Sequence, residues 1–185
     1  MRKTLKQGVL LLICWLNCVM ASSQTNISEL ILDAYHSPIS SSEEAEIIGR
    51  LRPLKLLSRD LVNSQSDSIQ YLYHYCLATL NNLENNVLES LDHIDMALQL
   101  REKSVGIKDA QYIELLCLKA NLLKESEPTK AIRAYQQAYV VAQGLLHTNN
   151  DAITFWFEQC LSGLGDLYIQ RDYIQQGIAF YRAAF

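Results

Sequence analysis

The stretch "LSGLGDLYIQRDYIQQGIAFYRAA", Leu161–Ala184, decides the fold because it spaces small and large residues as two packed helices require. Counted from Gly165, its marked positions fall at −4, −1, 0, +3, +12, +16 and +19: Leu161, Leu164, Gly165, Tyr168, Gly177, Tyr181 and Ala184. A small residue within one helix and another early in the next let two antiparallel helices approach closely, while large residues one turn away fill the space between hairpins. The stretch therefore predicts a helical hairpin with its turn at "QRDY".

Two upstream segments repeat this pattern. Residues 116–139, "LCLKANLLKESEPTKAIRAYQQAY", and residues 75–98, "YCLATLNNLENNVLESLDHIDMAL", place small residues at Ala120 and Ala131 and at Ala78 and Ser90. Pro128 stands where the second helix of its copy should begin, since a first-turn residue needs no N–H. Few turn-formers, with seven glycines and three prolines in 185 residues, also favour long helices over a sheet. We expect an all-α fold of stacked antiparallel hairpins over about 67–107, 108–148 and 149–185.

These positions resemble the tetratricopeptide repeat family, whose signature places a large residue, Leu-Gly, Tyr, Ala, Phe or Tyr, and Ala at similar offsets. The small residues recur after 42 and 45 residues, from Ala78 to Ala120 to Gly165, which is longer than the usual period of about 34. The spacing is similar to the long-repeat variant of kinesin light chains. The first copy departs from the signature at His74 and Asn81. The resemblance implies an α-solenoid.

In that family the first helix of each repeat lines a concave groove that holds an extended peptide or a partner's helix. The resemblance places fifteen side chains there, at offsets −6, −3, +1, +4 and +5 from each small residue: Leu72, Tyr75, Thr79, Asn82, Leu83, Glu114, Cys117, Asn121, Lys124, Glu125, Gln159, Ser162, Asp166, Ile169 and Gln170. The candidate binding residues among them are Leu72, Tyr75, Thr79, Glu114, Asn121, Lys124, Asp166 and Gln170. Asn121 with Lys124 resembles a fragment of a carboxylate-binding arrangement, without a full basic clamp. The alternative is that all are ordinary solvent-facing helix residues.

Residues 22–66 are expected to form a divergent helical hairpin that caps the first repeat. Apolar residues recur at helical intervals between residues 27 and 63, with loops at 22–28 and 37–42. Ser41 and Glu44 form a capping-box pattern. Pro53 should break the helix near Arg52.

The first 21 residues have the three-part pattern of a secretory signal peptide. Arg2, Lys3 and Lys6 precede an apolar run that ends at Leu16, and small residues favour cleavage after Ala21, with Ser23 as second choice. The run is short for a membrane span, so we expect export, with membrane attachment only if the segment is retained. Lipoprotein processing at Cys18 is less favoured. Cleavage would remove three basic residues and no acidic ones, so the formal net charge would fall from −4 to −7.

Catalytic, metal and cofactor motifs are missing from the sequence. The three cysteines beyond the signal segment, Cys76, Cys117 and Cys160, match no zinc spacing and are expected to be small buried hydrophobes. The four histidines form no helix-face metal pair, and His74 is expected to be a partly buried ring. No basic cluster points to nucleic acid. We expect no enzyme activity, no cofactor and no metal.

The sequence therefore favours an exported scaffold that binds a polypeptide partner. The alternative is the extracytoplasmic sensor portion of a longer signalling or transcription-regulatory protein, and a third is a small-ligand-binding helical protein. Phe180, Tyr181 and Phe185 leave an apolar face with no polar helix after it, which suggests a longer chain or self-association through that face.

Overall fold

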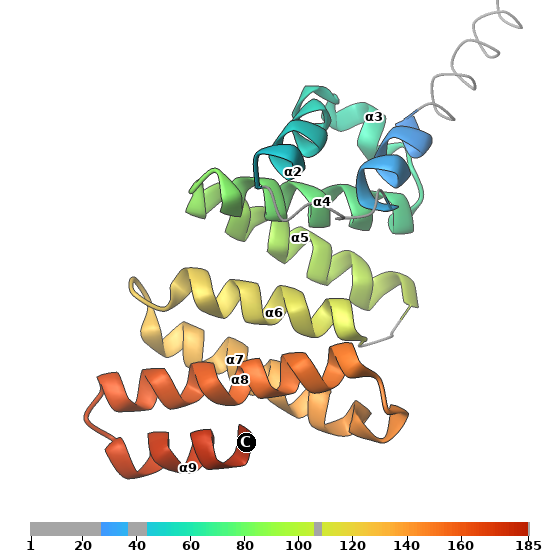
Figure 1. Ribbon diagram of the computed structural model, residues 1–185. Helices are drawn as coiled ribbons and strands as arrows, with labels where there is room; N and C mark the ends of the chain where they lie inside the picture. Colours follow the sequence, from blue (N-terminus) through green and yellow to red (C-terminus); the bar gives the residue numbers. More distant parts are fainter. Residues whose placement is uncertain (1–26, 37–43, 106–108, 185) are drawn as a thin grey trace, which may run out of the picture.

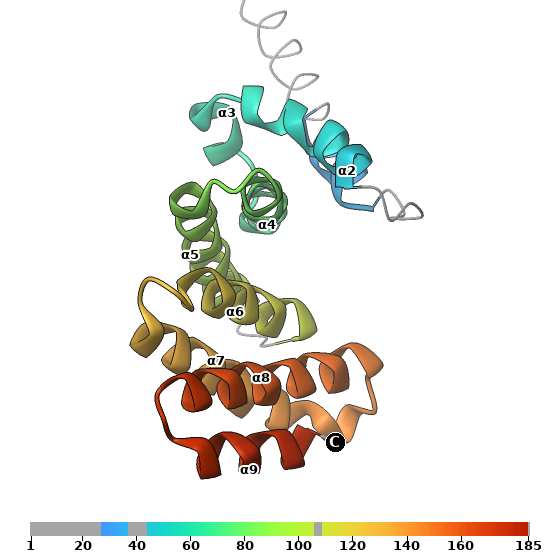
Figure 2. The same ribbon diagram turned by 60° about the vertical axis from the view of Figure 1, so that its left-hand side comes forward.

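The computed structural model in Figure 1 describes residues 27–36, 44–105 and 109–184. Within these residues the protein is all-α, without strands, and its helices pack in sequential antiparallel pairs (Figures 1 and 2). The all-α prediction is confirmed. The predicted signal peptide, the Ser41 cap and Phe185 lie outside the described residues.

The pairs follow one another along the molecule in chain order. Helix α4 (Asp67–Leu83) pairs with α5 (Val87–Val105), α6 (Ala110–Leu123) with α7 (Pro128–Leu145), and α8 (Asp151–Gln170) with α9 (Ile174–Ala184). A short 3₁₀ turn, η2 (Leu146–Thr148), follows α7. Helix α6 also packs directly against α8, so the first helices of these two pairs lie side by side.

Local signals in the sequence set where these helices begin and end. The side chains of Ser66, Asp109 and Asn150 cap α4, α6 and α8 by accepting hydrogen bonds from backbone N–H groups of the first turn. Helix α7 begins at Pro128, as predicted. The turns after α4 and α8 contain Asn85 and Asp172 at φ values of 59° and 64°, a region that these two residue types tolerate better than most.

The predicted small residues lie where paired helices approach one another. Ala78 and Ser90 are both fully buried, and the Ser90 hydroxyl donates to the Ala78 carbonyl at 2.9 Å. Gly165 and Gly177 also meet closely, because a Cβ added to Gly177 would lie 2.8 Å from the Gly165 carbonyl oxygen. In the middle pair, Ala120 and Ala131 are likewise fully buried.

An N-terminal layer covers α4. It consists of the helical residues 27–36, α2 (Glu44–Leu51), the 3₁₀ turn η1 (Arg52–Leu56) and α3 (Arg59–Asn63). Helix α2 ends at Leu51 and Pro53 lies in the first turn of η1, so the predicted break near Arg52 is confirmed. Ile27 and Ser28, expected in a loop, are helical, because Ile27 is buried in the core that this layer forms with α4.

Two groups of buried side chains hold the protein together. One runs through α4 to α8, and the other lies between the N-terminal layer and α4. Leu72 and Tyr75, on α4, pack against both groups. No helix among the described residues is long and apolar enough to cross a membrane.

Candidate functional site

A cleft opens where the N-terminal layer meets α4 and α6. Its volume is about 490 Å³, and one wall comes from residues 27–36 and α2 while the other comes from α4 and α6. Three candidate residues, Tyr75, Thr79 and Glu114, lie in it together. Its lining combines apolar surface with both signs of charge: Ala34, Tyr35, His36, Ile47, Arg50, Leu51, Tyr75, Cys76, Thr79 and Glu114.

Tyr75 connects the two walls of this cleft. Its ring meets that of Tyr35 edge to face, with centroids 5.7 Å apart, and its hydroxyl donates to Glu114 Oε1 at 2.7 Å. Burial raises the pKa of Tyr75, and the negative charge of Glu114 raises it further, so the hydroxyl stays protonated and keeps donating. Tyr75 therefore orients the Glu114 carboxylate toward the cleft.

Glu114 is a carboxylate held in a partly buried position. Burial raises its pKa, and the hydrogen bond from Tyr75 opposes that rise. A charged group at such a site is stabilised by a cation or donor from a bound partner. Glu114 is thus the residue of the cleft best suited to a basic or N–H-rich ligand.

The remaining α4 candidates have structural contacts. Leu72 is half-buried between the two cores, and the Thr79 hydroxyl donates to the Tyr75 carbonyl at 3.2 Å. Thr79 still borders the cleft, whereas Leu72 does not.

The C-terminal candidates are tied to one another rather than presented together to solvent. Lys124 Nζ on α6 lies 2.6 Å from Asp166 Oδ2 on α8, and the Tyr181 hydroxyl on α9 donates to Oδ1 of the same carboxylate. The Tyr135 hydroxyl donates to Asn121 Oδ1 at 2.5 Å. A ligand carboxylate at Asn121 and Lys124 would have to compete with these bonds. Gln170, at the end of α8, is exposed and lies apart from the cleft.

Cys117 was predicted to line the groove, and that prediction is wrong. Its side chain is buried to 1% exposure and contacts Cys160. The prediction from the repeat spacing failed because α8 packs against α6 and covers Cys117. The expectation that all three cysteines are buried is confirmed.

A histidine pair was missed by the sequence reasoning. His74 Nδ1 and His93 Nδ1 are 2.8 Å apart, and their rings border a second cleft of about 400 Å³ with Tyr73, Glu89 and Asp92 among its lining residues. Burial, together with the neighbouring His93, lowers the pKa of His74 to about 4. The two residues face each other because α4 and α5 are antiparallel and cross at Ala78 and Ser90. His74 precedes Ala78 by four residues on α4, and His93 follows Ser90 by three residues on α5, so both lie about one turn from the crossing on the same side. Among the described residues, no cluster of three histidine, cysteine, aspartate or glutamate side chains could hold a metal ion.

No protein-family model, curated protein or solved structure matches this chain.

Proposed function

We propose that this chain is an exported helical-repeat protein of the tetratricopeptide type that binds a polypeptide partner in the cleft around Tyr75 and catalyses no reaction. One observation carries the proposal: Tyr75, Thr79 and Glu114, chosen from repeat offsets on two successive helix pairs, border a single cleft. The buried small residues at the helix crossings support the repeat assignment.

The cleft suits a side chain with an apolar body and a polar or basic end. Tyr35, Ile47 and Leu51 offer apolar and aromatic surface, and Glu114 lies on the opposite wall. Its volume of about 490 Å³ lies within the range of roughly 300–1,000 Å³ that ligand pockets occupy. A partner would gain affinity from the apolar anchor, while Thr79, Glu114 and Arg50 would fix its register.

The test uses a residue that borders the cleft without belonging to the core. Thr79→Arg should fill the cleft, whereas alanine at Leu72 or Tyr75 would also damage both cores. Thr154→Arg is the matched control, because Thr154 is exposed on α8 outside the cleft. Circular dichroism would verify that both variants are folded.

Peptides selected from a random phage-displayed library against the full wild-type chain would serve as probes, with affinities measured by fluorescence anisotropy. We expect Thr79→Arg to weaken binding at least about tenfold, a change of about 1.4 kcal/mol, and Thr154→Arg to leave it unchanged. Equal binding by wild type and Thr79→Arg would place the peptide site elsewhere. Failure to select any peptide would count against a polypeptide ligand.

Export has its own test. The secreted product should have an N-terminus at Ser22 and a mass that lacks residues 1–21. A product that retains Met1 would refute cleavage without bearing on the cleft.

A further inference from the structure

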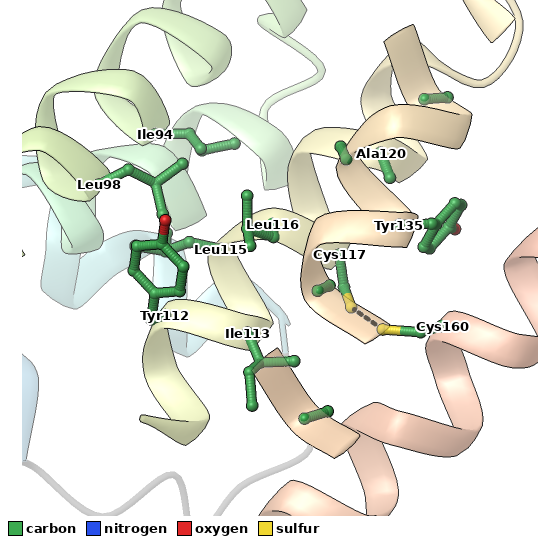
Figure 3. Packing of buried hydrophobic residues seen from close by; sticks show 14 of the residues in the cluster. Ile94, Leu98, Tyr112, Ile113, Leu115, Leu116, Cys117, Ala120, Tyr135 and Cys160 are labelled. Atoms are coloured by element: carbon green, nitrogen blue, oxygen red, sulfur yellow. Dashed lines mark hydrogen bonds between the residues drawn. The ribbon is translucent and has the colours of Figure 1, made fainter. Parts of the chain in front are cut away.

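Two buried thiols on successive helix pairs lie close enough to bond. Cys117 Sγ on α6 and Cys160 Sγ on α8 are 3.2 Å apart, with side chains pointing toward each other (Figure 3). Their side chains are 1% and 0% exposed. A disulfide bond is about 2.05 Å long, so bond formation would bring the sulfur atoms only about 1 Å closer.

We propose that Cys117 and Cys160 form a disulfide bond that joins α6 to α8 when the protein folds in an oxidising environment. The two helices already pack against each other, which holds the two sulfur atoms side by side. Where the bond forms in the cell depends on the proposed export, because oxidising compartments retain disulfides and the cytosol does not. The chemical proposal itself is independent of peptide binding.

The third cysteine is kept apart by the fold. Cys76 is buried in the core beneath the N-terminal layer, whereas Cys117 and Cys160 belong to the core that runs from α4 to α8. One pair plus one isolated thiol accounts for an odd number of cysteines beyond residue 21.

The bond forms by thiol–disulfide exchange with a small disulfide such as oxidised glutathione. The thiolate of one cysteine attacks the glutathione disulfide and releases one reduced glutathione. The second cysteine then attacks the mixed disulfide and releases another. Two cysteine thiols are oxidised to one disulfide, one glutathione disulfide is reduced to two thiols, and the protons pass to the released glutathione.

The exchange belongs to folding rather than to the finished structure. The hydrogen bond with Cys160, together with burial, raises the pKa of Cys117, so this thiol stays protonated in the folded protein. Both sulfurs must be reached before α8 docks on α6. Once formed, the bond is shielded from reductants by the same packing.

The experiment refolds the full chain in a buffer of oxidised and reduced glutathione, blocks free thiols in denaturant, and maps tryptic peptides by mass spectrometry. The three core cysteines fall on separate peptides, residues 60–101, 109–119 and 134–171. We expect the second and third to be linked and Cys76 to be alkylated. The proposal would be overturned if the protein refolded with Cys117 and Cys160 both alkylated as free thiols. It would also be overturned if either cysteine were linked to a different cysteine.

A thermal scan provides the second measurement. Closing the loop between the two cysteines should raise the melting temperature by on the order of 10 °C over the reduced protein. Cys76→Ala should keep this redox-dependent difference, and Cys117→Ala should lose it. If Cys117→Ala does not fold, the wild-type peptide map and the Cys76→Ala scan still decide. A wild-type melting temperature insensitive to reduction would contradict the bond.

Discussion

The close contact between α8 and α9 at Gly165 and Gly177 gives the sharpest prediction about stability. Gly177 of α9 lies against α8, where an added Cβ would be 2.8 Å from the Gly165 carbonyl oxygen and 2.5 Å from Ile169 Cγ1. The Ile169 side chain could move, but the carbonyl oxygen belongs to the backbone of α8. Gly177→Ala should therefore push α9 away from α8.

Two opposing effects set the size of the change. Alanine in place of glycine within a helix gains about 1 kcal/mol, while overpacking typically costs about 1–3 kcal/mol. Because the obstacle is backbone, we expect the cost to win and the variant to lose up to about 2 kcal/mol of unfolding free energy. Gly144→Ala is the matched control: Gly144 is also helical, on α7, and nothing lies within 4 Å of its added Cβ. That variant should be stabilised by up to about 1 kcal/mol.

Urea unfolding followed by far-ultraviolet circular dichroism would measure both variants. Hydrogen exchange of the α9 amides, Ile174–Ala184, would detect separation of α9 even if the other helices hold. If Gly177→Ala gained as much stability as Gly144→Ala and α9 kept its protection, the close approach of the two glycines would be refuted.

The remaining predictions concern polar groups that bond to a neighbouring helix. Because the folded pKa of His74 is about 4 and its ordinary value is 6.5, the unfolded chain takes up a proton first, so unfolding free energy should fall as pH drops from 6.5 toward 4, by on the order of 2–3 kcal/mol. Burial also lowers the pKa of His93; Lys55 and Arg59 lower it further, and Asp92 and Glu89 oppose them. His74→Gln should make the unfolding free energy depend less on pH between about pH 7 and 5, as measured by urea unfolding. An unchanged pH dependence would contradict the prediction. Burial acts to raise the pKa of Asp166, but the hydrogen bonds from Lys124 and Tyr181 lower it, so Lys124→Met should raise this pKa. The loss of unfolding free energy should stay below about 1 kcal/mol. If the ion pair is absent in solution, NMR titration of the Asp166 carboxylate would show no change in its pKa. Ser90→Ala should cost about 1 kcal/mol through loss of its hydrogen bond to Ala78, and Ser90→Val should cost more because the crossing is fully buried; equal thermal stability of the two variants would argue against a tight crossing.

Helices and their crossings could be predicted because they depend on local, periodic features. Small residues such as Ala78 and Gly165 have few roles other than close packing when they recur at hairpin spacing, and the structure buries both. Pro53 and Pro128 fix a helix end and a helix start through the same backbone chemistry in any context.

Candidate binding residues were harder to predict. Their positions relative to the small crossing residues predict which face of the helix a side chain occupies, but not which other side chains contact it. Lys124 and Asp166 were both assigned to the groove, yet opposite charges on adjacent helices pair with each other before they meet a ligand. The cleft depends on a wall from residues 27–36 and α2, outside the repeat pattern. His74 and His93 could have been found by extending the antiparallel crossing at Ala78 and Ser90 by one helical turn.

The contacts between the first helices of successive pairs span similar sequence separations. Tyr71 bonds to Gln111 across 40 residues, Tyr75 to Glu114 across 39, Cys117 meets Cys160 across 43, and Lys124 meets Asp166 across 42. These separations lie close to the 42 and 45 residues between the small crossing residues, as the proposed repeat assignment predicts. Side chains that make such contacts stabilise the stacking and are unavailable to a partner unless they also border open space. Tyr75 and Glu114 satisfy both conditions, whereas Cys117 and Cys160 are sealed in the core. The proposed peptide site therefore lies between the N-terminal layer, α4 and α6, and the proposed disulfide lies between α6 and α8.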